Sequence, residues 1–253
     1  MHIETHGSGP DLVLIHGWAM HGGIFAPLLA ALEPHFRIHL VDLPGHGHSR
    51  DEAHFDIADS ARAIAAATPR ALWVGWSLGG LVALRAALDG PGHVRGICLI
   101  ASSPRFVAAP DWPHGVAASV FGEFASELHA RYRHAIERFL ALETMGSVHA
   151  QAELRELKKR VFARGEPRVE ALCDGLAALD RCDFRDALAG LAMPSLWLGG
   201  RRDRLVPPGA LQWAAAHAPR ARHLEFNSGH APFLEFAAAI ADALVAFETE
   251  QSA

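Results

Sequence analysis

The chain has 253 residues, of which 50% are hydrophobic and 20% are charged, and its formal net charge is -5. This balance excludes an intrinsically disordered chain and predicts one globular core domain with room for an insertion. The small negative charge gives no reason to expect nucleic acid or an anionic membrane surface as a partner.

Short apolar runs alternate with longer amphipathic stretches from Asp11 onward. This alternation is typical of βα units and predicts an α/β fold with a mostly parallel central sheet flanked by helices. A turn at residues 7–10 joins an N-terminal edge strand to the first run. The expected strands are 12–15, 38–41, 72–76, 96–101, 195–199 and 223–226, and the clearest helical patterns are 57–67, 78–88 and 235–248.

The βα alternation stops between residues 108 and 183, where the sequence has only helical periodicity. Prolines precede this stretch, and Gly146 and the segment 165–167 divide it. We therefore expect a helical cap at 108–183, inserted into a core built from 1–107 and 184–253, and positioned over an active site.

The sequence shows no signal for export, for membrane insertion or for disulfide formation. Residues 1–7 have neither a basic nor an apolar segment, so we expect a cytoplasmic protein. The longest apolar stretch, about 71–84, is too short for a membrane span. The three cysteines lack C-x-x-C spacing, which predicts free thiols rather than a disulfide framework or a zinc site: Cys98, Cys173 and Cys182.

The pentapeptide Gly75-Trp76-Ser77-Leu78-Gly79 lies between a predicted strand and a predicted helix. In that setting a G-x-S-x-G sequence indicates a nucleophile elbow, because glycines on both sides of the serine allow strand and helix backbones to approach closely. Ser77 is therefore the candidate nucleophile.

A serine hydroxyl needs a base and an acid that orients the base, and on this kind of sheet the chain order is Ser, Asp or Glu, then His. Both partners should follow strands at the carboxyl edge of the sheet. His230 follows the last predicted strand, and Asp203 follows the strand before it. We expect these two residues to complete a triad; the competing acids are helix caps or surface charges, namely Asp180, Asp183 and Asp186.

An acyl transfer also needs N–H donors that face the developing oxyanion. The backbone N–H of Leu78 opens the helix after Ser77 and should supply one. The second should come from Trp18, after the strand 12–15, where Gly17 permits close approach. For the Trp18 side chain we favour a wall of the acyl pocket over a core aromatic, because it follows a strand at the active edge, and the two roles are compatible.

His46 and His48 stand in a glycine-rich segment after the strand 38–41. The pair suggests metal binding but lacks a third ligand, and no H-E-x-x-H sequence occurs. A tight turn that braces the elbow is the preferred interpretation. The expected serine chemistry requires neither a metal nor an organic cofactor, and none is predicted.

Taken together, these motifs resemble the α/β-hydrolase superfamily over essentially the whole chain. The segments are His16-Gly17-Trp18, Asp42-x-Pro-Gly-x-Gly-x-Ser49, Gly75-x-Ser-x-Gly79, Gly200-x-x-Asp203 and Gly229-His230. More narrowly, the chain resembles the pimeloyl-[acyl-carrier protein] methyl ester esterases of biotin synthesis. The most specific matches lie in the cap, at Glu137-Arg138-Phe139-Leu140-Ala141-Leu142, Thr144-Met145-Gly146 and Leu157-Lys158-Lys159.

The resemblance implies hydrolysis of the methyl ester of a pimeloyl chain carried on acyl carrier protein. We expect the protein to be a monomer. The resemblance also implies that an acyl tunnel beside Trp18 is lined by Phe139, Leu140, Ala141, Leu142 and Glu143. A helical face that packs within the cap is the alternative for Phe139. Substrate contacts from Ser77, Leu78 and His230 complete the expected site.

Acyl carrier protein is acidic, so its docking surface should be locally basic. The candidates are cap residues: Arg138, Arg155, Lys158 and Lys159. A solvated helix face is the alternative for each of them. The family pattern also has basic residues where this chain has His134 and Gln151.

Two other functions fit the same motifs. One is a general short-chain carboxylesterase or lactonase of this fold. The other is a noncatalytic ligand receptor built on a hydrolase fold, because a fold alone does not fix the function.

Overall fold

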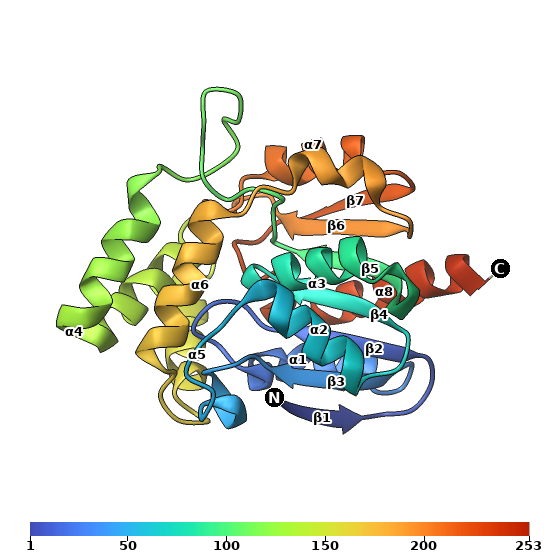
Figure 1. Ribbon diagram of the computed structural model, residues 1–253, viewed down its shortest axis with the longest axis horizontal. Helices are drawn as coiled ribbons and strands as arrows, with labels where there is room; N and C mark the ends of the chain where they lie inside the picture. The colour runs from blue at the N-terminus through green and yellow to red at the C-terminus, as the bar shows by residue number, and fades with distance from the viewer. Residues whose placement is uncertain (253) are drawn as a thin grey trace.

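The computed structural model describes residues 1–252 and contains a seven-stranded sheet in the order β1-β3-β2-β4-β5-β6-β7 (Figure 1). Strands β2 to β7 are parallel, and β1 pairs antiparallel with β3. The strands are β1 His2–His6, β2 Asp11–Ile15, β3 Arg37–Asp42, β4 Ala71–Trp76, β5 Val94–Ile100, β6 Ser195–Gly200 and β7 Ala221–Phe226. The predicted α/β architecture is confirmed, with each predicted strand present within two residues of its expected start.

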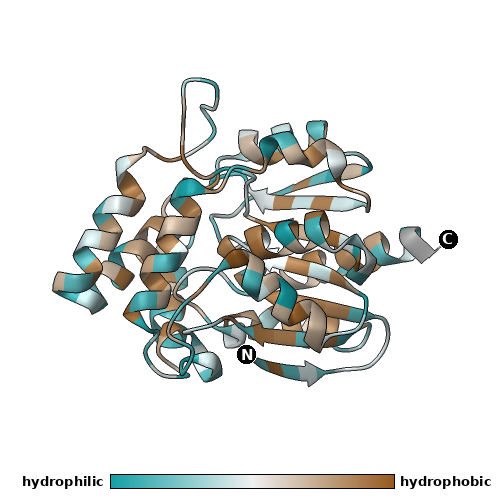
Figure 2. Cartoon of the chain, in the orientation of Figure 1, coloured by the Kyte–Doolittle hydropathy of each residue, from teal (hydrophilic) through white to brown (hydrophobic). Residues whose placement is uncertain are grey.

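The central strands are hydrophobic because helices cover both faces of the sheet. All six residues of β4 are buried, as are the last four of β2. Figure 2 shows these strands mainly in the colour of hydrophobic residues, whereas the edge strand β1 is mixed. Continuous apolar runs are typical of parallel strands buried on both faces, and they place the core of the molecule along β2, β4 and β5.

Two helices cover each face of the sheet centre. Helices α1 (Ala26–Leu32) and α8 (Ala237–Ser252) pack together on one face, and α2 (Ile57–Ala67) and α3 (Leu78–Asp89) pack on the other (Figure 1). Helix α7 (Pro208–His217) packs against β6 and β7. Helix α8 begins two residues later than predicted, because residues 232–234 form the 3₁₀ turn η5.

Three further helices separate β5 from β6 in the chain: α4 (Ser119–Thr144), α5 (Ala150–Val161) and α6 (Val169–Arg181). They lie together beyond the carboxyl ends of the parallel strands (Figure 1). Helix α4 is kinked at Arg131, whose φ of -147° and ψ of 58° are not helical. This group of helices faces the edge of the sheet at which open α/β sheets bind ligands.

In residues 1–252, no helix combines the length and the apolar character needed to cross a bilayer.

Candidate active site

Ser77 lies in the sharp turn between β4 and α3. Its φ of 51° and ψ of -117° are uncommon for a residue with a side chain, which is the strain expected of a nucleophile elbow. A Cβ at Gly75 would overlap the carbonyl oxygen of Gly79, and a Cβ at Gly79 would overlap that of Ile15. The two glycines are therefore required by the close approach of α3 to β4 and β2.

Ser77, His230 and Asp203 form one hydrogen-bonded chain although 153 residues separate the first two. The Nδ1 of His230 is 2.7 Å from Oδ2 of Asp203, and its Nε2 is 2.9 Å from Oγ of Ser77. Since a carboxylate only accepts hydrogen bonds, we assign the proton of the neutral imidazole to Nδ1. The Nε2 lone pair then faces the serine hydroxyl and can take its proton.

Backbone N–H groups fix the Asp203 carboxylate. Its Oδ1 accepts hydrogen bonds from the N–H groups of Leu205 (2.8 Å) and Val206 (2.9 Å), so Oδ2 is left for His230. The loop that carries His230 is held by Trp76, whose indole N–H donates to the carbonyl of His230 at 2.8 Å. The competing acids Asp180, Asp183 and Asp186 are all exposed, and Asp183 pairs with Arg105 and Arg185.

Opposing effects act on the pKa of His230. Burial lowers it, but the charge of Asp203 and its hydrogen bond raise it, and the net pKa lies above the usual histidine value. The imidazolium formed when His230 takes a proton is thereby stabilised. A base of this kind suits proton abstraction near neutral pH.

The loop after β2 reaches the nucleophile. A Cβ at Gly17 would lie 3.2 Å from the Cβ of Ser77, so this loop runs directly beside the serine. The backbone N–H of Leu78 is in the first turn of α3 and has no intrahelical acceptor. Oxyanion donors from the N–H groups of Trp18 and Leu78 stay a prediction, which the position of the Gly17 loop and of the start of α3 supports.

The Trp18 side chain connects the core to the group α4–α6. It is fully buried, its ring centroid is 4.4 Å from that of Phe139 in α4, and its indole N–H donates to the Leu172 carbonyl in α6 at 2.9 Å. Trp18 is therefore both a core aromatic and a neighbour of the nucleophile loop.

The five residues 139–143 do not share one environment. Phe139, Leu140 and Glu143 are buried, Leu142 is half-buried, and Ala141 is exposed. Successive residues of an α-helix point about 100° apart, so five consecutive residues cannot all face one cavity. The lining of an acyl tunnel by residues 139–143 stays a prediction, and the exposure of Ala141 sets this residue apart from its buried neighbours.

Glu143 is a buried carboxyl group beside the triad. Its backbone carbonyl accepts the N–H of His230 (3.3 Å), and neither carboxyl oxygen has a hydrogen-bond partner in the described part of the chain. Burial raises the pKa of Glu143 to about 8, the charge of His230 lowers it, and that of Asp203 raises it. The sequence named Glu143 only through the resemblance, and no pattern in the sequence indicates that it is buried beside His230.

The segment around His46 and His48 forms the expected tight turn. Asp42 accepts hydrogen bonds from the N–H groups of Gly22 (2.6 Å) and His48 (2.8 Å), which braces the turn against β3. His46 is buried beside His16, with ring centroids 5.2 Å apart. Burial lowers the pKa of His46 to about 4. His46 and His48 therefore point into different surroundings.

The basic residues of α4 and α5 differ in how they are paired. Arg138 contacts Glu127, and Lys158 lies 2.7 Å from Glu137. Arg155 and Lys159 are exposed on α5, and neither has an ion-pair partner among residues 1–252. Both charges are therefore available to a partner.

The reacting groups are covered in this structure. Ser77 and His230 are 0% exposed and Asp203 is 3% exposed. Helix α6 lies over the site, because a Cβ at its Gly175 would be 2.9 Å from the Trp18 ring and 3.2 Å from the Leu78 side chain. A substrate therefore reaches Ser77 only after some of the groups that cover it move.

Comparison with known proteins agrees with the fold and the site. A model of the α/β hydrolase fold family matches residues 10–237. An esterase from Exiguobacterium antarcticum superposes with a TM-score of 0.86 over 97% of this chain and 94% of its own, at 21% identity. The chain therefore belongs to the α/β hydrolase fold family.

Relatives define a narrower family. A pimeloyl-[acyl-carrier protein] methyl ester esterase from Xanthomonas campestris pv. campestris (strain B100) is 55% identical over 249 residues, which are 98% of each chain. One of the same name from Stenotrophomonas maltophilia (strain K279a) is 55% identical over 98% of this chain and 96% of its own. The chain is a member of the family that these relatives form.

Proposed function

We propose that this protein is a serine carboxylesterase that hydrolyses the methyl ester of pimeloyl-[acyl-carrier protein], releasing methanol and pimeloyl-[acyl-carrier protein]. The observation that carries the chemistry is the chain of hydrogen bonds from Asp203 through His230 to Ser77. The substrate is supported by the relatives of that name, which match over nearly the full chain.

The geometry supports a two-step acyl transfer. The Oγ of Ser77 attacks the ester carbonyl carbon while its proton passes to Nε2 of His230, and the N–H groups of Leu78 and Trp18 stabilise the oxyanion. His230 then protonates the methoxide, which leaves as methanol. Water attacks the acyl-enzyme with His230 again as base, and the carboxylate product leaves Ser77 free.

The cap is the second part of the proposal. Residues 108–183 act as a helical cap on a core formed by 1–107 and 184–253. The pimeloyl chain lies between Trp18 of the core and the buried cap face that includes Phe139 and Leu140. The buried aromatic pair of Trp18 and Phe139, at 4.4 Å, supports an apolar surface suited to methylene groups.

Acyl carrier protein is the proposed partner, and α5 its docking surface. The chain has a net charge of -5, so an acidic partner must meet a local positive patch. Arg155 and Lys159 supply unpaired charge for this purpose, with Lys158 and Arg138 beside salt-bridged glutamates. The protein acts in the cytoplasm as a monomer.

Methanol release from methyl pimeloyl-[acyl-carrier protein] tests the proposal, with Ser77→Ala as the matched variant. We expect Ser77→Ala to lower kcat by roughly 10⁵–10⁶-fold with an unchanged far-UV circular dichroism spectrum. Retention of most of the activity would overturn the assignment of Ser77.

The substrate is tested by competition between esters. A strong preference of the wild-type enzyme for free short esters or lactones over the carrier-bound ester would favour a general esterase. Failure of a fluorophosphonate probe to label Ser77 would favour a noncatalytic receptor. Growth rescue of a biotin-requiring host that lacks this esterase would support the carrier-bound substrate.

A further inference from the structure

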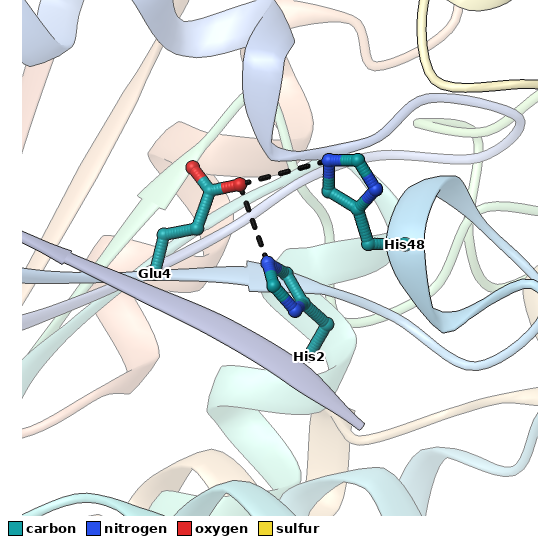
Figure 3. Close-up of side chains that lie close together, drawn as sticks. All are labelled: His2, Glu4 and His48. Atoms are coloured by element: carbon teal, nitrogen blue, oxygen red, sulfur yellow. Dashed lines mark hydrogen bonds and ion pairs between the residues drawn. The ribbon is translucent and has the colours of Figure 1, made fainter.

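Three side chains at the edge of the sheet bring metal-binding atoms together, away from the triad residues. Among residues 1–252, His2, Glu4 and His48 are the one group of three or more histidine, cysteine or acidic side chains whose ligand atoms all lie within 4.8 Å of one another. Figure 3 shows both imidazoles turned toward the same carboxylate oxygen of Glu4. Strand β1 thus supplies two ligand groups beside His48, and the His46 of the sequence pair is not one of the three.

The backbone at this cluster is held in place. His2 and Glu4 are two residues apart on β1, so their side chains share one face of the strand. The N–H of His2 donates to Oγ of Ser49 (2.7 Å), and the N–H of His48 donates to Asp42 (2.8 Å). Strand β1 and the 3₁₀ turn η2 (Gly47–Ser49) are therefore fixed relative to each other before any ligand binds.

The spacing suits a tetrahedral ion. Ligand atoms about 2.0–2.1 Å from a zinc ion stand about 3.3–3.4 Å apart. Oε1 of Glu4 is 3.3 Å from Nε2 of His2 and 3.8 Å from Nε2 of His48. All three ligand atoms lie within 4.8 Å of one another, and the half-exposed His48 ring has room to rotate toward a bound ion.

The surrounding charges also suit a cation. Arg164 lies 3.0 Å from Oε1 of Glu4 and 3.1 Å from Asp42, so two carboxylates face one guanidinium. When a metal takes Oε1 of Glu4, Arg164 keeps Asp42 and Oε2 of Glu4, at 3.1 Å.

We infer that His2, Glu4 and His48 form a binding site for one divalent transition-metal ion of the zinc class, which joins strand β1 to the turn η2. Two imidazoles and one carboxylate are a common zinc ligand set, with water in the fourth position. The site is independent of the hydrolytic reaction. Because the metal would bind the folded chain in preference to the unfolded one, it would stabilise the fold.

Calorimetric titration of tag-free, chelator-treated protein with zinc chloride tests the inference. We expect one zinc ion per chain, and a weakening of at least about tenfold in His2→Ala and in His48→Ala. His93→Ala, which removes an exposed histidine elsewhere, should bind like the wild type. Cobalt(II) should give the visible absorption of a tetrahedral site in the wild type and lose it in His48→Ala.

Thermal unfolding adds a second measurement. Zinc at about 100 times its Kd should raise the Tm of the wild type by about 5–10 °C and that of His48→Ala much less. Matching Tm values of the metal-free proteins would show that His48→Ala folds normally. Wild-type affinity in His2→Ala and His48→Ala, an equal loss in His93→Ala, or no stoichiometric binding would each overturn the inference.

Discussion

At the scale of a single residue, the burial of Glu143 decides which protonation state of this carboxyl group lies beside the triad. Glu143 is 1% exposed, with two carboxyl oxygens that lack a hydrogen-bond partner among the described residues. An ionised carboxylate in that position would carry a large desolvation cost, so the neutral acid is the form that the fold accommodates. Near neutral pH the triad therefore lies beside an uncharged carboxyl group rather than a second negative charge.

This burial makes stability depend on pH with a definite sign. The pKa of Glu143 is raised from 4.5 to about 8 on folding. Between these values the folded chain holds a proton that the unfolded chain has lost, so this group lowers the free energy of unfolding as pH rises. The slope for one proton is about 1.4 kcal/mol per pH unit.

Glu143→Gln should remove that slope. Relative to the wild type, we expect the variant to gain stability steadily between about pH 5 and pH 8, as measured by urea unfolding. Glu123→Gln, at an exposed position of the same helix, should show no such trend. A stability difference that stays constant over this pH range would contradict the assignment of a neutral Glu143.

The residues of the triad could be predicted from the sequence, whereas Glu143 could not be placed beside them. Ser77, Asp203 and His230 each follow a parallel strand, and the carboxyl ends of parallel strands meet at one edge of the sheet. Glu143 lies on a helix whose position depends on tertiary packing, which local periodicity does not contain. The cluster at His2, Glu4 and His48 depends likewise on the antiparallel pairing of β1 with β3.

At the scale of elements, helix α6 packs directly over Trp18 and Leu78. Its Gly175 allows the helix backbone to lie against Trp18 and Leu78, which larger residues would not permit. The sequence predicts helices in this region but not which residue of α6 touches the core. That contact arises from the packing of α6 between α4 and α3.

Gly175→Val should push α6 away from Trp18 or narrow the acyl space. Since small misplacements near reacting groups can cost about 10²-fold in rate, we expect a loss of that order in kcat/KM for methyl pimeloyl esters. Gly122→Val is the matched control, because a Cβ at Gly122 of α4 meets nothing within 4 Å. Equal activity of Gly175→Val and Gly122→Val would show that α6 does not shape the site.

At the scale of the whole molecule, charge is arranged unevenly. The chain is acidic overall, yet Arg155 and Lys159 present unpaired positive charge on α5. Most other basic side chains of α4 and α5 form ion pairs with glutamates. Such a patch can steer an acidic partner toward one face without making the protein basic.

The double variant Arg155→Glu and Lys159→Glu should weaken turnover of the carrier-bound ester only. We expect kcat/KM for methyl pimeloyl-[acyl-carrier protein] to fall about tenfold at low salt and less at high salt, because salt screens exposed charges. Activity on free methyl esters should remain unchanged. Arg70→Glu is the control, because Arg70 precedes β4 and so lies at the amino ends of the parallel strands, opposite the carboxyl ends that carry the site. A parallel loss on free esters would mean that α5 affects catalysis rather than docking.

Because Ser77 and His230 are completely buried, turnover depends on two rates. One is the rate at which the site opens, and the other is the rate of the chemical steps. Hydrolysis requires some of the groups that cover Ser77, among them α6, to move before an ester reaches the serine hydroxyl. The frequency of that opening is an upper limit on turnover, and no improvement in the triad can raise it. Selection for speed in such a protein would act on helix contacts far from the reacting atoms, such as that of Gly175 with Trp18.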